Sequence, residues 1–120
     1  MKKILFVIIC LVFIVGCSSD KADDGLVTYM EAKEMIINEG AILIDVRTEQ
    51  EYNEGHIGGA VLLTLDTINE KTAEEVIEGK NNTVILYCRS GNRSSQAMTL
   101  LNNLGYTNVY DLGAMSNWEE

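Results

Sequence analysis

Residues 84–98 read VILYCRSGNRSSQAM, and this stretch decides the fold. The first four residues, VILY, form an apolar run of the kind that makes a buried β-strand. From Ala97 onward the apolar residues recur at helical spacing, and Gly105 ends that pattern. A buried strand, a short polar loop and an amphipathic helix in this order are typical of an α/β domain. Ligands of open α/β sheets bind beyond the carboxyl ends of the strands, which is where Cys88 is expected to lie.

The same alternation of strand and helix continues on both sides of this stretch. Strands are expected at 41–45, 60–63, 84–87 and 109–112. Three helices should begin at residue pairs with capping-box spacing and end near a glycine: Thr28 with Glu31 up to Gly40, Thr48 with Glu51 up to Gly55, and Thr72 with Glu75 up to Gly79. Because these strands are apolar throughout, residues 26–120 are predicted to form an α/β domain with a central, mainly parallel sheet covered by helices on both faces.

The loop after Cys88 has the features of an anion-binding site. We expect the next helix to begin around Ser94, so that its free N–H groups and the positive end of its dipole face the loop. Gly91 and Asn92 tolerate left-handed backbone conformations, which can turn successive amides inward as an anion nest. The thiol of Cys88 would then lie in a cradle that favours its anionic form.

Two arginines, Arg89 and Arg93, add positive charge beside this thiol, and the whole chain has only three arginines. We therefore expect the pKa of Cys88 to lie well below the value of about 8.5 of a free cysteine. The alternative is a buried, inert cysteine that ends a core strand, since cysteine is often a small core residue. The arginines and the glycine around Cys88 favour the reactive thiolate.

The N-terminus resembles a secretion signal. Lys2 and Lys3 precede an apolar run at 4–15, which is shorter than the roughly 20 residues needed to span a bilayer. The run ends in IVGC at 14–17, which is similar to the lipobox of bacterial lipoproteins, where the cysteine becomes a lipid-bearing N-terminus. This resemblance implies a signal peptide at 1–16, palmitate-type lipidation of Cys17 with a flexible tether at 17–25, and an extracytoplasmic protein anchored to a bacterial membrane in the cell envelope. An ordinary cleaved signal, or an uncleaved anchor, would leave Cys17 incidental.

Such processing would leave Cys88 as the one thiol of the mature chain. Cys10 lies in the leader and Cys17 would carry lipid, so neither a disulfide nor a CxxC redox pair is expected. A Cys/His metal site is not expected either, because His56 is the one histidine. Removing the two leader lysines takes the net charge from −9 to about −11, and a chain this acidic repels nucleic acid.

Three motifs, in the right order, resemble those of single-domain rhodaneses. They are ILIDVRTEQEYNEGHIGGA at 42–60, CRSGNRS at 88–94 and VYDLGAMSNW at 109–118. The resemblance covers residues 27–118 and implies a rhodanese-like three-layer domain, in which the central sheet lies between helices. The sequence departs from the family at Gly58, where proline is usual, and at Ala114, where a second glycine is usual.

The resemblance implies sulfurtransferase chemistry at the loop. The Cys88 thiolate would take the outer sulfur of a donor such as thiosulfate, and the resulting persulfide would pass it to a thiol or a cyanide-like acceptor. Arg89 and Arg93 would steady the anionic donor while the loop amides hold the persulfide. Ser94 and Ser95 are expected first to cap the following helix. The residues expected to bind substrate are Arg89, Ser90, Gly91, Asn92, Arg93 and Ser94.

Other motif residues are expected to support the site. Asp45 and Arg47 look like a charged pair that braces this edge of the sheet, with an ordinary strand-end pair as the alternative. His56 is expected to make a structural hydrogen bond in the Gly-His-Ile turn, and Trp118 is expected to pack against the core. We expect no metal, no cofactor and a monomeric protein.

Two other functions fit the same motifs. Phosphatases of a related fold use a cysteine–arginine loop that is one residue longer than the six residues from Cys88 to Arg93. Rhodanese domains also act as non-catalytic sulfur carriers or partner-docking modules, and the partner here would be a protein of the cell envelope.

Overall fold

The computed structural model describes residues 24–119. The expected signal peptide at 1–16, the lipidation of Cys17 and most of the tether at 17–25 therefore lie outside the described residues. Within residues 24–119, no helix is both long enough and apolar enough to cross a membrane. The first described residues lie against the domain, because the amide of Asp111 donates to the Gly25 carbonyl at 2.8 Å and the amide of Val27 donates to the Asp111 carbonyl at 3.0 Å.

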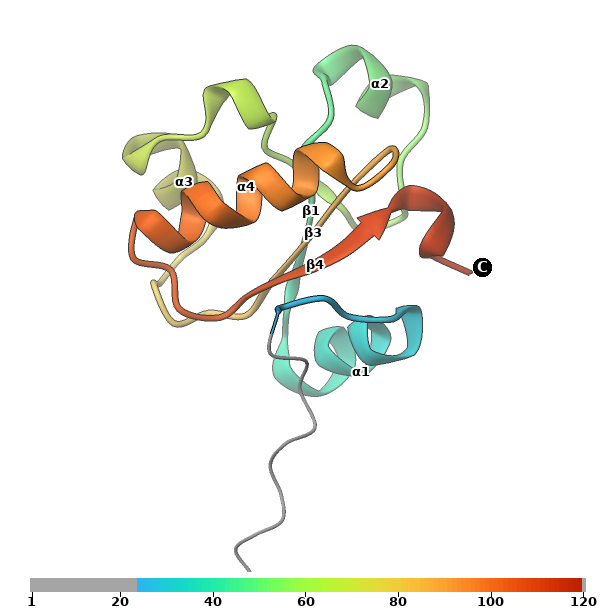
Figure 1. The fold of residues 1–120 in the computed structure, drawn as a ribbon, viewed down its shortest axis with the longest axis horizontal. Helices are drawn as coiled ribbons and strands as arrows, with labels where there is room; N and C mark the ends of the chain where they lie inside the picture. Colours follow the sequence, from blue (N-terminus) through green and yellow to red (C-terminus); the bar gives the residue numbers. More distant parts are fainter. Residues whose placement is uncertain (1–23, 120) are drawn as a thin grey trace, which may run out of the picture.

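A four-stranded parallel sheet forms the centre of the domain (Figure 1). Its order is β2-β1-β3-β4, with β1 at Ile42–Asp45, β2 at Val61–Leu62, β3 at Val84–Cys88 and β4 at Val109–Ala114. The strand expected at 60–63 is thus confined to two residues. The neighbouring strands pair in parallel, so their carboxyl ends meet at one edge of the sheet. That edge brings the end of β1, with Asp45, close to the end of β3, with Cys88.

Helices cover both faces of this sheet (Figure 1). On one face lies α1, Tyr29–Glu39, which buries Ala32 and Met35. On the other face lie α3, Glu70–Val76, and α4, Asn92–Asn103, while the short α2, Glu49–Glu54, lies near the carboxyl edge of the strands. Successive side chains of β3 alternate between the two faces, as they must in a strand. Tyr87 therefore packs in the core under α1, and Cys88 packs in the core under α4.

The helix starts agree only partly with the sequence predictions. Both threonine capping boxes are present, at Thr28 for α1 and at Thr48 for α2. The prediction for α3 was wrong, because the cap is Asn69, whose side chain and that of Thr72 each accept a hydrogen bond from the other residue's amide. Asparagine is among the best capping residues, so the helix begins one turn earlier than expected and ends at Val76.

Candidate active site

The loop from Cys88 to the start of α4 wraps closely around one sulfur atom. Cys88 is fully buried, at 0% exposure, at the carboxyl end of β3. The amide of Gly91 donates to its Sγ at 3.0 Å, and the amide of Ser94 donates to it at 3.3 Å. Gly91 has φ +103°, a left-handed conformation that glycine adopts without a steric penalty, and this turns its N–H back toward the sulfur. The expected cradle of amides around the thiol is therefore present in the structure.

Ser94 has a different position from the one expected. The helix α4 begins at Asn92 with Gly91 as its N-cap, so Ser94 lies inside the first turn and its side chain is not a cap. Its buried hydroxyl accepts a hydrogen bond from the Cys88 thiol at 3.6 Å and donates its own proton to the Gly91 carbonyl at 3.2 Å. Asn92 is helical and not left-handed, and its side chain accepts a hydrogen bond from Gln96. The glycine alone supplies the turn, which lets the helix begin two residues earlier than expected.

The environment of the thiol lowers its pKa. Burial raises the pKa of Cys88, but hydrogen bonds from the Ser94 hydroxyl and from the amides of Ser94, Gly91 and Ser90 outweigh it. Such bonds stabilise the thiolate more than the thiol, because the anion is the stronger acceptor. The shift has the expected direction, and the hydrogen bonds from these neutral donors lower the pKa of Cys88 more than the neighbouring arginines do.

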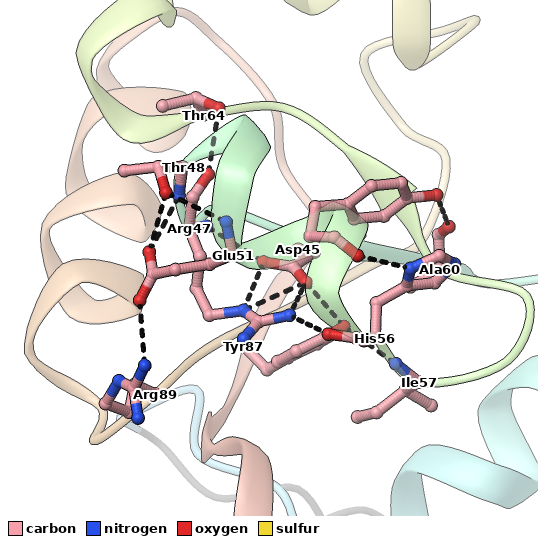
Figure 2. Close-up of polar contacts among 12 residues, drawn as sticks. Asp45, Arg47, Thr48, Glu51, His56, Ile57, Ala60, Thr64, Tyr87 and Arg89 are labelled. Atoms are coloured by element: carbon pink, nitrogen blue, oxygen red, sulfur yellow. Dashed lines mark hydrogen bonds and ion pairs between the residues drawn. The ribbon is translucent and has the colours of Figure 1, made fainter.

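The two loop arginines point to a glutamate on α2. Arg93 forms a two-pronged ion pair with Glu51, with Nη1–Oε1 at 2.8 Å and Nη2–Oε2 at 3.1 Å. Arg89 also reaches Glu51, at 3.4 Å, and its side chain is 69% exposed (Figure 2). Both guanidinium groups therefore already have an anionic partner. The sequence suggested Glu51 only as the second residue of a capping box, and it has that role as well.

A second polar network braces the edge of the sheet beside the loop (Figure 2). Asp45 and Arg47 form a buried ion pair at 2.7 Å, and Arg47 also donates to the Gly55 carbonyl at 2.7 Å. The hydroxyl of Tyr87 donates to Asp45 at 2.7 Å and accepts from the amide of Ile57 at 3.1 Å. Burial raises the pKa of Tyr87, so its hydroxyl keeps the proton that it donates. The side chains of Asp45, Arg47 and Tyr87 thus connect β1, β3 and the loop after α2, and we call these three residues the polar brace. The sequence motifs indicated Asp45 and Arg47 but not Tyr87.

Asp111 is a buried acid that the sequence analysis did not single out. It lies on β4, where the pairing with β3 shifts by one residue after Leu86. Its carboxylate accepts a hydrogen bond from the amide of Gly113 at 2.8 Å. Burial nevertheless raises the pKa of Asp111. The one signal for it was an acidic residue inside an otherwise apolar strand.

The remaining motif residues lie at the periphery of the site. His56 Nδ1 is 2.8 Å from the Tyr52 carbonyl, and its ring stacks on that of Tyr52 with centroids 3.7 Å apart. Trp118 meets the ring of Tyr29 edge-on, at 4.9 Å between centroids, beside the core under α1. No group of three or more His, Cys, Asp or Glu side chains that could hold a metal ion occurs among residues 24–119.

This fold, with a cysteine cradled by amides at the carboxyl end of a parallel strand, is the arrangement that the resemblance to single-domain rhodaneses implied. The family model of the rhodanese-like domain matches residues 28–120, so the chain belongs to the rhodanese-like family. Among its relatives, thiosulfate sulfurtransferase PspE of Escherichia coli is 38% identical over 74 residues, which are 62% of this chain and 70% of PspE.

Other relatives agree on the fold. A solved rhodanese with anions from E. coli is 35% identical, has a TM-score of 0.59, and is matched over 64% of this chain and 89% of its own. The human single-domain sulfurtransferase TSTD1 has a TM-score of 0.65 over 78% of this chain and 94% of its own, and at 24% identity it shows the fold alone. The tRNA uridine(34) hydroxylase of Buchnera aphidicola is 31% identical over 71% of this chain, but the chain spans only 29% of that protein. The predicted rhodanese-like α/β fold is confirmed.

Proposed function

We propose that this protein transfers sulfane sulfur through a persulfide on Cys88. Its class, a rhodanese-type sulfurtransferase, follows from the family membership and from its similarity to PspE. In the first step the Cys88 thiolate forms a bond to the outer sulfur of thiosulfate, the S–S bond of the donor breaks, and sulfite leaves with the electron pair. In the second step a thiolate or cyanide attacks the outer sulfur, and the Cys88 thiolate leaves.

The observation that carries this proposal is the set of donors around Cys88 Sγ. The amides of Gly91 and Ser94 already lie at 3.0 and 3.3 Å from the sulfur, and the Ser94 hydroxyl lies at 3.6 Å. Fixed donors of this kind stabilise the thiolate both as the attacking group of the first step and as the leaving group of the second. The two amides need no rearrangement when negative charge returns to the sulfur.

The other residues of the loop would position the donor. Ser90 and Asn92 are exposed on either side of the half-buried Gly91, and Arg89 and Arg93 flank this turn with their positive charge. Arg93 also interacts electrostatically with the thiolate: Glu51 raises the pKa of the Arg93 guanidinium most, and the charge of Cys88 raises it further. The ion pair of Asp45 with Arg47 would hold the neighbouring loop in place without touching the substrate.

Mass spectrometry of the protein after treatment with thiosulfate tests the proposal directly. We expect Cys88 to gain one sulfur atom, cyanide to remove it as thiocyanate, and Cys88→Ser to do neither while remaining folded. Thiocyanate production by Cys88→Ser at the wild-type rate would refute the mechanism. A persulfide that forms but is not passed to cyanide or small thiols would instead indicate a sulfur carrier that needs a protein partner. Faster release of phosphate from an aryl phosphate than of sulfur from thiosulfate would indicate a phosphatase.

We also propose that the protein is a lipoprotein of the cell envelope, with residues 1–16 as signal peptide and lipid on Cys17. Support comes from the basic start, the apolar run and the IVGC segment at 14–17. In a bacterial host the full chain should appear in the membrane fraction and incorporate labelled palmitate. Cys17→Ser should abolish both, and label that persists in this variant would refute the proposal.

A further inference from the structure

The arginines of the loop are neutralised by a side chain that comes from outside the loop. Glu51 lies on α2 and its side chain is 17% exposed. Its two oxygens take both terminal nitrogens of Arg93, and one of them also contacts Arg89. This two-pronged geometry is the strongest that arginine forms with a carboxylate. The two terminal nitrogens of Arg93 therefore point to Glu51 and not to the mouth of the loop, by which we mean the solvent-facing side of residues 89–93.

The charges at the mouth cancel as a consequence. When Cys88 is a thiolate, its charge and that of Glu51 balance the charges of Arg89 and Arg93. The nearby Arg47 adds no net charge, because it is paired with Asp45. The whole chain carries −9. An approaching donor thus meets a loop without net positive charge on an acidic protein. Because electrostatic repulsion by the acidic protein scales with the charge of the donor, a dianion is disfavoured more than a monoanion.

From this arrangement we propose that Glu51 sets the donor specificity, and that the site takes donors with one negative charge at the reacting end in preference to dianions. The inference rests on the proposed sulfur transfer. The favoured chemical class comprises organic thiosulfonates and organic persulfides. With a thiosulfonate, the Cys88 thiolate bonds to the outer sulfur, the S–S bond breaks, and the sulfinate leaves with the electron pair.

Two donors that share the same reacting S–S bond but differ by one negative charge can separate the effect of charge from that of the reaction itself. Thiosulfate is a dianion, and methanethiosulfonate has a methyl group in place of one anionic oxygen, so it is a monoanion with the same reacting S–S bond. The quantity to measure is the ratio of kcat/KM for thiosulfate to kcat/KM for methanethiosulfonate. Persulfide formation on Cys88, followed by mass spectrometry, reports the first step for both donors.

Glu51→Gln removes the negative charge and leaves the helix start intact. In the wild-type protein the Glu51 carboxylate accepts from the amide of Thr48 at 2.9 Å, and the side-chain oxygen of glutamine should keep this bond because glutamine serves in a capping box as glutamate does. The matched control is Glu54→Gln, which removes one charge from the same helix. Glu54 is exposed, and its carboxylate accepts a hydrogen bond from the Gln50 side chain at 3.3 Å.

We expect Glu51→Gln to raise the ratio roughly three- to fivefold, which is the upper part of what one exposed charge pair contributes. Glu54→Gln should change it less than about twofold, since its charge is solvated. An unchanged or lowered ratio in a folded Glu51→Gln would overturn the inference, and a lowered ratio would mean that Glu51 positions the arginines for dianions. If neither donor yields a Cys88 persulfide in the wild-type protein, the proposed function itself fails.

A second measurement needs no variant. Sulfate and methanesulfonate are a dianion and a monoanion of similar shape that cannot donate sulfur. At pH 8 both should protect Cys88 from iodoacetamide at concentrations within about threefold of each other, because the mouth has no net charge to favour the dianion. Protection by sulfate at a concentration more than about tenfold lower would contradict the inference even if Glu51→Gln did not fold.

Discussion

Two buried tyrosines make it possible to test the polar brace with one chemical change. Tyr87→Phe deletes a hydroxyl that donates to Asp45 at 2.7 Å and accepts from Ile57 at 3.1 Å. A hydrogen bond to a charged group contributes about 1.5–3 kcal/mol, and a buried amide left without an acceptor costs about 1–3 kcal/mol. Since one hydroxyl serves both bonds, we expect a total loss of about 3 kcal/mol. The ring stays in place, and with it the contact of Arg47 at 5.9 Å from its centroid.

Tyr106→Phe is the matched control. Tyr106 is 2% exposed, and its hydroxyl has no hydrogen-bond partner among residues 24–119. Removing a buried hydroxyl that lacks a partner should be neutral or should stabilise the protein by up to about 1 kcal/mol. The two substitutions delete the same atom, so only the surroundings of the hydroxyl distinguish them.

Urea unfolding followed by circular dichroism measures both changes. With a slope of about 1–2 kcal/mol per M, the midpoint of Tyr87→Phe should fall by about 2 M, and that of Tyr106→Phe should not fall. The slope itself should stay unchanged, because neither variant alters the surface exposed on unfolding. Equal midpoints for the two variants, or a larger loss for Tyr106→Phe, would refute the assignment of the Tyr87 hydroxyl as a member of the brace.

Three further substitutions test the surroundings of the thiol. Burial raises the pKa of Asp111, so the contribution of this group to stability is present at low pH and is lost as pH rises through its folded-state pKa. Asp111→Asn should therefore raise Tm at pH 7 and leave it unchanged near pH 3. Gly91→Ala should cost about 1–2 kcal/mol in urea unfolding, because φ is +103° although a Cβ would have space, 3.7 Å from Gly113 Cα. Ser94→Ala should move the pH profile of Cys88 alkylation by iodoacetamide to higher pH, and an unmoved profile would mean that the hydroxyl does not stabilise the thiolate.

The sequence predicted features that depend on neighbouring residues. The capping boxes at Thr28 and Thr48 and the buried strand at 84–87 follow from local hydrogen bonds and apolar runs, and the structure contains them. The cradle around Cys88 was also predictable, because a glycine and a helix start lie within six residues of it. Even there, the start of α4 was placed two residues late, since the serines looked like better caps than Gly91.

The partners of the charged side chains could not be predicted in this way. Arg93 and Glu51 lie 42 residues apart in the chain, and only the packing of α2 beside the loop brings them together. Nothing in the composition of the loop shows that its arginines are already paired. Tyr87 and Asp45 are likewise 42 residues apart and meet because β1 and β3 are neighbours in register. The electrostatics of the site therefore depend on tertiary contacts, whereas the shape of the loop follows from the local sequence around Gly91.

The complete burial of Cys88 also decides which of two sulfur atoms an acceptor can attack. A persulfide on Cys88 would have an inner sulfur that lies among the loop amides and an outer sulfur bonded to it at about 2.05 Å. Attack on the outer atom passes the sulfur on and restores the enzyme. Attack on the inner atom would release hydrosulfide and leave a mixed disulfide on the protein. By enclosing the inner atom, the loop would direct the acceptor to the outer sulfur and would keep it from forming that mixed disulfide.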